Sequence, residues 1–378
     1  HLKRGDAKME QTRFIKTGSS TFFGEYLYDQ VVPKDHFLRI LRKVVDWEYF
    51  TKRLIKIYKG QGVVGRPPFD PAMMLKVEVI AYLYKLSERQ VEVFVNENLP
   101  AKYFVGLAVD GKAPDHSTLT IFRERLLKNG KVKIFEEMLA QIVKEAILRG
   151  VKFGSIQIID SVHTIADVNT EKDQNRQHKG KGPHDPDARW GVKHKHKAKN
   201  EKGEEITQTD YFFGYKAHVS MNAESGLITS LGTTSGEAFD GHHFCTLVDH
   251  DLAQGLPVDT YAADKGYDDG DNHYYLELKK LHSAIHLKEN RTEKKDPHKK
   301  VWLNLKKTPQ YKDGLKERYK IERKFGEAKQ SHGFNRCRYV GKARYTVQSI
   351  LMAIVLNLKR MVKLLTGVNF KARAYATE

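Results

Sequence analysis

The sequence predicts an α/β protein in which an all-helical domain over residues 31–150 precedes a mixed-sheet domain over residues 151–366. Before Gly150, apolar residues recur at three- and four-residue steps, as on one face of a helix. After Gly150, short runs rich in β-branched residues begin, bounded by turn-forming residues. Helical patterns then return between and after these runs, which is typical of a sheet covered by helices. Residues 1–30 are predicted as a loosely docked arm, and residues 367–378 as a C-terminal tail.

The helical half contains signals that are typical of short, capped helices. An apolar helical pattern over residues 35–50 stops at a Gly- and Pro-rich segment over residues 60–68, because these residue types disfavour a helix interior. Asp70 followed by proline indicates the start of the next helix, which we expect to run to Tyr84. Ser87 with a glutamine three residues later predicts a capping box and another short helix.

A further helix is expected to begin after Asp115 or Ser117 and to carry Arg123 and Arg125. Short capped helices in this order resemble a helix-turn-helix module, in which case both arginines are candidate contacts to nucleic acid. A small helical bundle with charged outer faces explains the pattern equally well. A helix over residues 132–148 closes this half of the chain.

The second half of the chain is predicted to contain strands first and then strands alternating with helices, which favours a mixed sheet. The strands are expected at residues 155–159, 211–220, 227–233, 260–263 and 283–287, and the helices at residues 271–281, 311–329 and 343–365.

Two stretches of this half, residues 167–207 and residues 288–307, are rich in Lys and poor in large apolar residues. Both are predicted as long, solvated, basic loops that interrupt the sheet domain. Their lysines are either contacts to a polyanion or simply solvated charges. The candidates are Lys193, Lys195, Lys197, Lys299 and Lys300.

The charge balance of the chain indicates what kind of partner it has. Its 378 residues include 65 Lys and Arg against 47 Asp and Glu, which gives a formal net charge of +18. A surplus of this size favours a polyanionic partner, although basic surfaces with no partner also occur. Hydrophobic residues make up 40% of the chain, which excludes a wholly disordered protein.

Other features bear on the cellular environment. Cys245 and Cys337 cannot form a disulfide framework, so a reducing cytoplasm fits best. The longest apolar stretch, residues 350–358, is about half as long as a membrane-spanning helix, and no secretory pattern opens the sequence, so no membrane partner is expected. The segment 60–67 lacks the lysine of a phosphate-binding loop, and no nucleotide cofactor is expected.

Two aspartates directly follow predicted strands. Asp160 comes after the strand at 155–159, and Asp264 comes after the strand at 260–263. A carboxylate at such a position is held on a rigid element and points into the crevice where ligands of α/β sheets bind. A single aspartate after a strand is more often a turn or cap residue, but two in one small sheet favour a shared site.

A third carboxylate, Glu322, lies in the helix predicted over residues 311–329. At about 100° per residue, Arg318, Glu322 and Lys329 share one face of that helix, whereas Glu327 points elsewhere. An ordinary surface helix with salt bridges is the alternative for this helix considered alone.

Three carboxylates from two strands and a helix form an oxygen-only donor set, which suits Mg²⁺ or Mn²⁺. Two such ions about 3.5–4 Å apart activate a water or a 3′-hydroxyl and stabilise the leaving oxygen of a phosphodiester. An arginine and a lysine on the same helix face are suited to holding phosphates.

Three motifs carry these carboxylates: Ile-Ile-Asp160-Ser-Val-His-Thr, Tyr-Ala-Ala-Asp264-Lys-Gly-Tyr-Asp, and Arg318-x3-Glu322-x6-Lys329. In this order they resemble the DDE transposases of bacterial insertion sequences, most closely the branch whose last motif is called YREK. Leu315 stands where that motif has its tyrosine, and Tyr319 lies nearby. Segments 65–71, 211–218 and 333–338 are also similar to family segments.

The resemblance implies a ribonuclease H-like catalytic domain behind a helical domain that recognises the ends of a mobile element. It implies Mg²⁺-dependent or Mn²⁺-dependent cleavage and transfer of DNA strands, with two ions held by Asp160, Asp264 and Glu322. It also implies that Arg318 and Lys329 contact DNA phosphates.

Further residues and partners follow from the same resemblance. Arg336 is an additional candidate DNA contact, and His218 either supports Asp160 from a neighbouring strand or is a packed strand histidine. The partners implied are double-stranded DNA and a second copy of the chain in a synaptic complex, in a bacterial cytoplasm at the nucleoid. A related nuclease that cuts without joining, and a DNA-binding repressor that has lost catalysis, remain alternatives.

Overall fold

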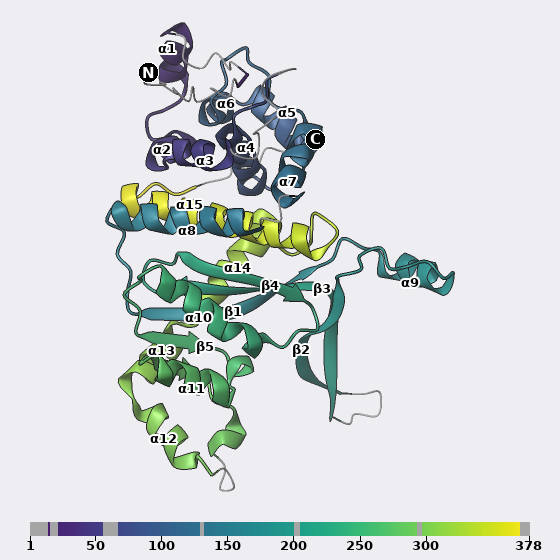
Figure 1. Cartoon of the computed structure of the whole chain (residues 1–378), viewed down its shortest axis with the longest axis vertical. Coiled ribbons are helices and arrows are strands. Elements are labelled where there is room, and N and C mark those ends of the chain that lie inside the picture. Colours follow the sequence, from purple (N-terminus) through teal and green to yellow (C-terminus); the bar gives the residue numbers. More distant parts are fainter. Residues whose placement is uncertain are drawn as a thin grey trace, which may run out of the picture. The chain divides into compact units, whose positions relative to one another are not determined.

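The computed structural model describes residues 14–15, 22–55, 67–128, 132–199, 205–292 and 297–370 (Figure 1). The chain divides into two compact units, residues 1–81 with 86–129, and residues 82–85 with 130–378. This division falls near residue 129 and not at residue 150, because helix α8 (Val132–Leu148) packs with α15 (Lys342–Thr366) and β4 (Ile228–Ser235) of the second unit.

Short helices make up the described part of the first unit. Ser87 and Gln90 form the predicted capping box, Asp70 accepts a hydrogen bond from the N–H of Ala72, and Asp115 accepts one from the N–H of Thr118. Two helices occupy the region over residues 35–50, and the predicted arm contains α1, while residues 1–13 and 16–21 of that arm lie outside the described part. The helices are α1 (Phe22–Val31), α2 (Phe37–Val44), α3 (Trp47–Leu54), α4 (Pro71–Leu83), α5 (Glu88–Glu97), α6 (Leu99–Val105) and α7 (His116–Lys128).

The second unit is built on a mixed sheet in which β3 is the longest strand. The first half of β3 pairs antiparallel with β2, and its second half lies between β1 and β4, antiparallel to both. On the other side of β1, strands β5 and β6 follow in parallel. The strands are β1 (Ile156–Ile165), β2 (Arg189–Lys199), β3 (Glu205–Asn222), β4, β5 (Thr260–Ala263) and β6 (His282–Ile285).

Helices cover this sheet. α8 and α15 lie side by side over β4 (Figure 1), and α15 is buried along most of its length. α10 and α11 close an apolar core with β1 and β5 that includes Phe244, Tyr261, Tyr267 and Leu276. α15 ends at Thr366, and residues 371–378 of the predicted tail lie outside the described part. The remaining helices are α9 (Thr170–His178), α10 (Phe244–Ala253), α11 (Gly270–Leu278), α12 (Lys299–Lys307), α13 (Pro309–Glu317) and α14 (Tyr319–His332).

The prediction of two long basic loops is wrong. Within residues 167–207, the structure has helix α9 and strand β2, which forms a ribbon with the first half of β3 (Figure 1). The paired backbones satisfy each other's hydrogen bonds, so this ribbon needs few buried side chains. Within residues 288–307, α12 forms because Trp302 is buried against Leu287 and Tyr311.

The helix predicted over residues 311–329 is two helices, α13 and α14, which meet at Arg318. The general architecture nevertheless confirms the predicted fold class, a helical region followed by a mixed, helix-covered sheet of the ribonuclease H-like kind. Among the helices in the described ranges, none combines the length and the apolar character needed to cross a membrane.

Candidate active site

Asp160 and Asp264 lie next to each other on adjacent parallel strands. β1 and β5 are in register from Ile156 with Thr260 to Ile159 with Ala263, so the two aspartates occupy the next position on each chain. The sequence predicted that Asp160 follows the end of its strand. In the structure Asp160 lies within β1, because this strand continues to Ile165 by pairing with β3. Asp160 lies directly after the last residue of β1 that pairs with β5. A carboxylate there projects from a backbone that is still fixed on one side.

Asp264 begins a tight 3₁₀ turn over residues 265–267, and its Oδ1 accepts a hydrogen bond of 2.6 Å from the N–H of Lys265. This contact fixes the carboxylate at the sheet edge and leaves its other oxygen available.

Arg318 connects Asp264 to Glu322. Its Nη2 atom lies 3.4 Å from Oδ1 of Asp264 and 3.9 Å from Oε1 of Glu322. Both separations are longer than a hydrogen bond, so these are loose ion pairs. The guanidinium is largely buried, whereas the Glu322 side chain is 63% exposed and has room to move.

Gly314 sets the position of Arg318. A Cβ at residue 314 would lie 2.4 Å from the Cβ of Ala284 on β6 and 3.3 Å from that of Ala262 on β5. Only a glycine therefore lets α13 lie directly on these two strands. Because Arg318 follows one turn later, the close packing of α13 brings the guanidinium to the carboxyl end of β5.

The local electrostatics disfavour charge on Asp160. Burial and the charge of Asp264 raise the pKa of Asp160, the Ser161 N–H and Arg318 lower it, and the net pKa is about 7. Burial, together with the charges of Asp160 and Asp240, also raises the pKa of Tyr267 well above 10. Neighbouring carboxylates in such a site are relieved by a cation.

The donor chemistry fits a hard divalent cation, because Asp160 and Asp264 present oxygen ligands side by side and Glu322 is close by. In the part of the chain that the structure describes, no three His, Cys, Asp or Glu side chains lie close enough to hold an ion together. Glu322 is the carboxylate that would have to approach, and its exposed side chain is free to do so.

Sequence reasoning missed a polar group beside Asp160. Ser161 donates a hydrogen bond of 2.8 Å from Oγ to Asp240 Oδ2, and the Lys216 ammonium lies 2.9 Å from Asp240 Oδ1. Asp240 begins a short 3₁₀ turn over residues 240–243. The signal in the sequence was Lys216 of the segment 211–218, which reaches Asp240 from β3.

His218 is buried and pairs in register with Ser161 rather than with Asp160. Its Nε2 lies 2.9 Å from Thr234 Oγ1, and its ring stacks on His243 at a centroid distance of 4.6 Å. Burial lowers the pKa of His218 to about 3, so it is neutral at physiological pH. These contacts are those of a packed strand histidine.

Lys329 lies over β1, where its Nζ is 3.5 Å from Nε2 of His163. Burial lowers the pKa of Lys329, and the charge of Lys193 on β2 adds to this effect. The structure thus places two of the predicted DNA-contacting lysines near each other, Lys329 on α14 and Lys193 on β2.

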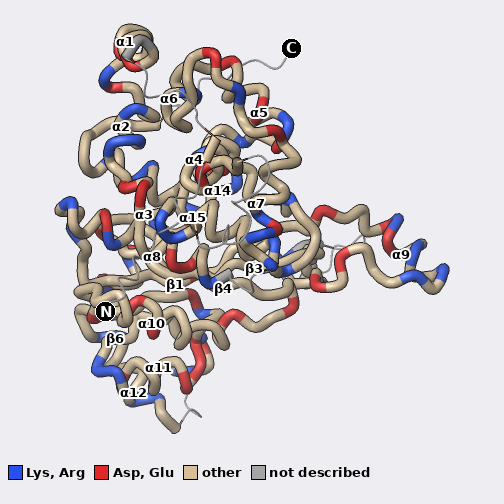
Figure 2. The backbone as a smooth tube through the Cα atoms, turned by 45° about the horizontal axis from the view of Figure 1, so that its top comes forward, with Lys and Arg blue, Asp and Glu red and all other residues tan. Residues whose placement is uncertain are grey.

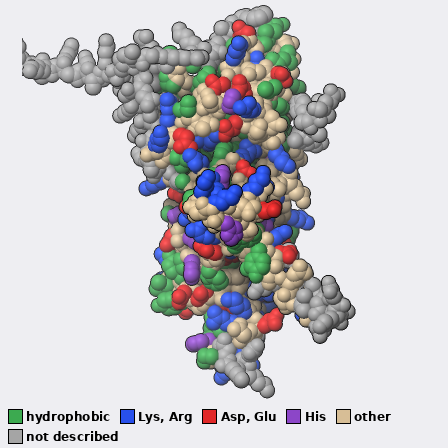
Figure 3. All heavy atoms as spheres, turned by 90° about the vertical axis from the view of Figure 1, so that its right-hand side faces the viewer, with side chains coloured by type: hydrophobic (Ala, Val, Ile, Leu, Met, Phe, Trp, Pro, Cys, Tyr) green, Lys and Arg blue, Asp and Glu red, His purple; other side chains and the backbone are tan. Residues whose placement is uncertain are grey.

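The other basic candidates have different surroundings. Arg336 is exposed and paired with Asp167 at 2.9 Å, and Lys197 is exposed and paired with Glu205 at 3.2 Å. Lys299 and Lys300 begin α12, and the side chain of Lys195 lies outside the described part. Figure 2 shows basic and acidic residues interspersed along the chain, and Figure 3 shows basic side chains gathered at the height of α9.

Arg123 corrects a prediction. It is buried within the first unit, where its guanidinium contacts the carboxylates of both Glu78 and Glu88. A cation neutralised in this way is not available to DNA, so its role is structural. Arg125, on the same helix, is half-buried.

The residues around the last motif also have defined places. Leu315 packs against the apolar cluster of Leu287, Trp302 and Tyr311, while Tyr319 is exposed beneath the guanidinium of Arg323. Glu327 is bound by Lys324 and Lys359 on the side of α14 away from Asp264.

Comparison with known families agrees with this geometry. Residues 26–125 match a family described as a transposase domain (DUF772), and residues 151–358, more than half of the chain, match the transposase DDE domain. Transposases act on DNA, and DDE transposases generally use divalent metal ions. The chain therefore belongs to the DDE transposases of insertion sequences.

Proposed function

We propose that this transposase binds the ends of its element and carries out metal-dependent cleavage and strand transfer of DNA, with Asp160, Asp264 and Glu322 as the catalytic carboxylates. The observation that carries the proposal is the placement of Asp160 beside Asp264, with Arg318 between Asp264 and Glu322. This arrangement supplies carboxylates and a phosphate-binding cation at a single sheet edge.

Asp160 and Asp264 would hold the metal, and Glu322 would complete its ligands. When bound, Mg²⁺ or Mn²⁺, as one or two ions, supplies Lewis-acid activation of the attacking water or 3′-hydroxyl. The turn at Lys265 keeps one Asp264 oxygen directed at the site, and the pairing of β1 with β3 keeps Asp160 fixed.

Arg318 is the residue proposed to bind the phosphate at the reacting bond. Its contacts to the two carboxylates are loose ion pairs, which can be exchanged for phosphate oxygens when those carboxylates turn to a metal. Lys329, whose Nζ lies 3.5 Å from Nε2 of His163 on β1, is proposed to hold a flanking phosphate together with Lys193.

Recognition of the element ends is assigned to the helical region over residues 31–150, which includes most of the segment that matches the DUF772 family. Joining requires two ends to be brought together, so we expect a homodimer in the synaptic complex. These two assignments rest on the family rather than on a contact.

The test is a cleavage and strand-transfer assay on a duplex that carries an element end, with Mg²⁺ or Mn²⁺. Wild type is compared with Asp160→Asn and Glu322→Gln, and with Asp313→Asn as a matched control. Asp313 is an exposed α13 carboxylate whose partner is Lys316. We expect both site variants to lose at least about 100-fold in rate and the control to keep wild-type activity.

Full activity in Asp160→Asn or Glu322→Gln would refute the assignment of the carboxylates. Cleavage without joining would indicate a nuclease, and binding with neither reaction in the wild type would indicate a repressor.

A further inference from the structure

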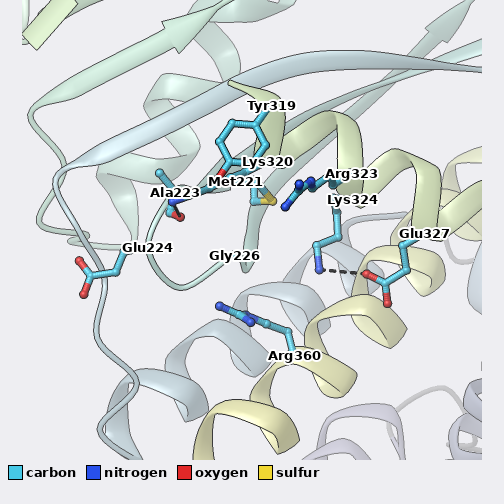
Figure 4. A pocket seen from close by; sticks show the side chains of 10 residues that line it. All are labelled: Met221, Ala223, Glu224, Gly226, Tyr319, Lys320, Arg323, Lys324, Glu327 and Arg360. Carbon is cyan, nitrogen blue, oxygen red and sulfur yellow. Dashed lines mark hydrogen bonds and ion pairs between the residues drawn. The ribbon is translucent and has the colours of Figure 1, made fainter. Parts of the chain in front are cut away.

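A second charged face of α14 lines a cavity that the proposed chemistry does not use. The cavity has a volume of about 310 Å³, and it lies between α14, α15 and the turn that joins β3 to β4 (Figure 4). This volume is at the lower end of small-ligand sites, which are about 300–1,000 Å³. Its lining residues are Met221, Ala223, Glu224, Gly226, Tyr319, Lys320, Arg323, Lys324, Glu327 and Arg360.

The cavity and the carboxylate site use different sides of the same helix. Tyr319, Arg323 and Glu327 follow one another at four-residue steps, so they form one stripe along α14. At about 100° per residue, Glu327 lies roughly 140° around the axis from Glu322. A ligand in the cavity is therefore separated from the carboxylates by the helix itself.

Cations outnumber carboxylates in this cavity. Four basic side chains line it, against Glu224 and Glu327. Glu327 is already shared by Lys324 at 3.3 Å and Lys359 at 2.6 Å. In Figure 4 the carboxylate of Glu224 points away from the basic groups. Lys320 is paired with Glu317 outside the cavity, and the positive charge that remains has no carboxylate to balance it within the cavity.

Arg323 and Arg360 carry this excess. Arg323 is exposed and held over the ring of Tyr319 at 4.8 Å, and no carboxylate of the described residues forms an ion pair with it. Arg360 donates from Nε to the carbonyl of Ser225 at 2.7 Å, which fixes its side chain on the cavity wall (Figure 4). A fixed guanidinium with free N–H groups favours planar or tetrahedral oxyanions.

Lys324 adds to the positive potential. Its ammonium lies on the cavity wall with 12% of the side chain exposed. Burial lowers the pKa of Lys324, and the charges of Arg360 and Lys359 oppose its protonation as well. An anion in the cavity would offset the burial of the Lys324 ammonium and its repulsion by Arg360 and Lys359.

We propose that this cavity binds a backbone phosphate of DNA, at a position separate from the reacting bond and on the opposite side of α14. The inference rests on the proposed function in that it takes DNA as the partner. Arg323 and Arg360 supply the hydrogen bonds to the phosphate oxygens, while Lys320 and Lys324 line the cavity in ion pairs with Glu317 and Glu327.

The experiment measures binding of a fluorescent DNA duplex in EDTA, so that no reaction occurs, at several salt concentrations. The variants are Arg323→Ala and Arg360→Gln, and the matched control is Lys363→Ala, which removes an exposed charge from α15 outside the cavity. Loss of one phosphate contact reduces the slope of log affinity against log salt by about 0.9. We expect this reduction, with an affinity loss of about tenfold, in both cavity variants and not in the control.

A second arm titrates inorganic phosphate into wild type and Arg323→Ala at constant ionic strength. Binding to the wild type alone, with unchanged DNA slopes, would overturn DNA as the source of the phosphate. Cavity variants that match Lys363→Ala in DNA binding, with equal phosphate binding by wild type and Arg323→Ala, would overturn the site. Intact DNA binding without cleavage in the wild type would refute the proposed function and leave the cavity result valid. Because Arg323 is exposed, its variant is expected to keep the wild-type unfolding temperature.

Discussion

Asp160 carries a cost for the fold when no cation is present. Its pKa of about 7 means that the folded chain resists ionising a carboxyl group that ionises near pH 4 when unfolded. Above pH 7 the folded state bears a charge that burial penalises, so stability is reduced there. As the pH falls from 7 toward 4, the folded state binds a proton that the unfolded state lacks, and the penalty disappears.

We therefore expect Asp160→Asn to stabilise the metal-free protein. Asparagine keeps an oxygen to accept the Ser161 N–H and removes the charge. Since the side chain keeps some solvent contact, the gain should be about 1–2 kcal/mol at pH 8. It should shrink to nothing near pH 4, as thermal unfolding in EDTA at several pH values would reveal. A gain that is equal at pH 4 and pH 8 would contradict this account.

The same residue predicts a response to metal that does not depend on activity. Adding Mn²⁺ to the wild type should raise the unfolding temperature, since an ion that binds only the folded state at 100 times its Kd contributes about 2.7 kcal/mol. Asp160→Asn should lack this response, and Asp313→Asn should retain it. Equal responses in all three proteins would place the metal elsewhere.

Two glycines on neighbouring helices allow the packing of α13 to be tested. Gly314→Ala forces a Cβ against Ala284 and should destabilise the protein by about 1–3 kcal/mol, with reduced cleavage because Arg318 moves. Gly326 lies inside α14, and a Cβ there meets no atom within 4 Å. Gly326→Ala should therefore stabilise the protein by about 0.5–1 kcal/mol. Thermal unfolding of the two variants should shift in opposite directions.

The ion pairs of α7 predict a large effect on the first unit. Arg123→Ala leaves Glu78, a buried carboxylate, without its cation, and breaking such a pair costs about 3–5 kcal/mol. The exposed Lys128 on the same helix is the control, and its alanine variant should change stability by less than about 0.5 kcal/mol. The stability change in both variants would be measured as the susceptibility of the helical unit to protease. If Arg123→Ala weakened DNA binding without loosening this unit, the burial argument would fail.

Helices and strands with strong local sequence signals could be predicted. Elements that form only by pairing or packing with a distant part of the chain could not. The boundaries of α8 and β5 match the prediction, because apolar periodicity and turn residues mark both ends. β2 has alternating Lys and His in place of an apolar face, and only pairing with β3 makes it a strand. The break at Arg318 was also missed, since the helical pattern continues across it.

The same distinction applies to the candidate site. Adjacent aspartates follow from two strands with a shared direction, which sequence patterns suggest. The Asp240 contacts of Ser161 and Lys216, and the burial of Arg123, depend on elements far apart in the chain. A local sequence pattern does not determine which side chains from distant parts of the chain contact each other.

The charge of the whole molecule predicts how it binds DNA. With a net charge of +18, many Lys and Arg should displace counterions when a duplex binds. Affinity should fall steeply with salt, by about 10³–10⁵ between 50 and 200 mM if six to ten phosphates are contacted. A flat salt dependence of the duplex Kd would mean that the basic surface does not touch phosphates.

The rigidity of α14 has a consequence for the length of DNA that this unit engages. Arg318 and Lys329 are eleven residues apart, which is about 16 Å along a helix axis at 1.5 Å per residue. A DNA strand advances about 3.4 Å per nucleotide, so a backbone running beside the helix passes about five nucleotides between the two cations. Because a helix keeps its length, the phosphate contacts proposed for Arg318 and Lys329 would span a fixed segment of substrate.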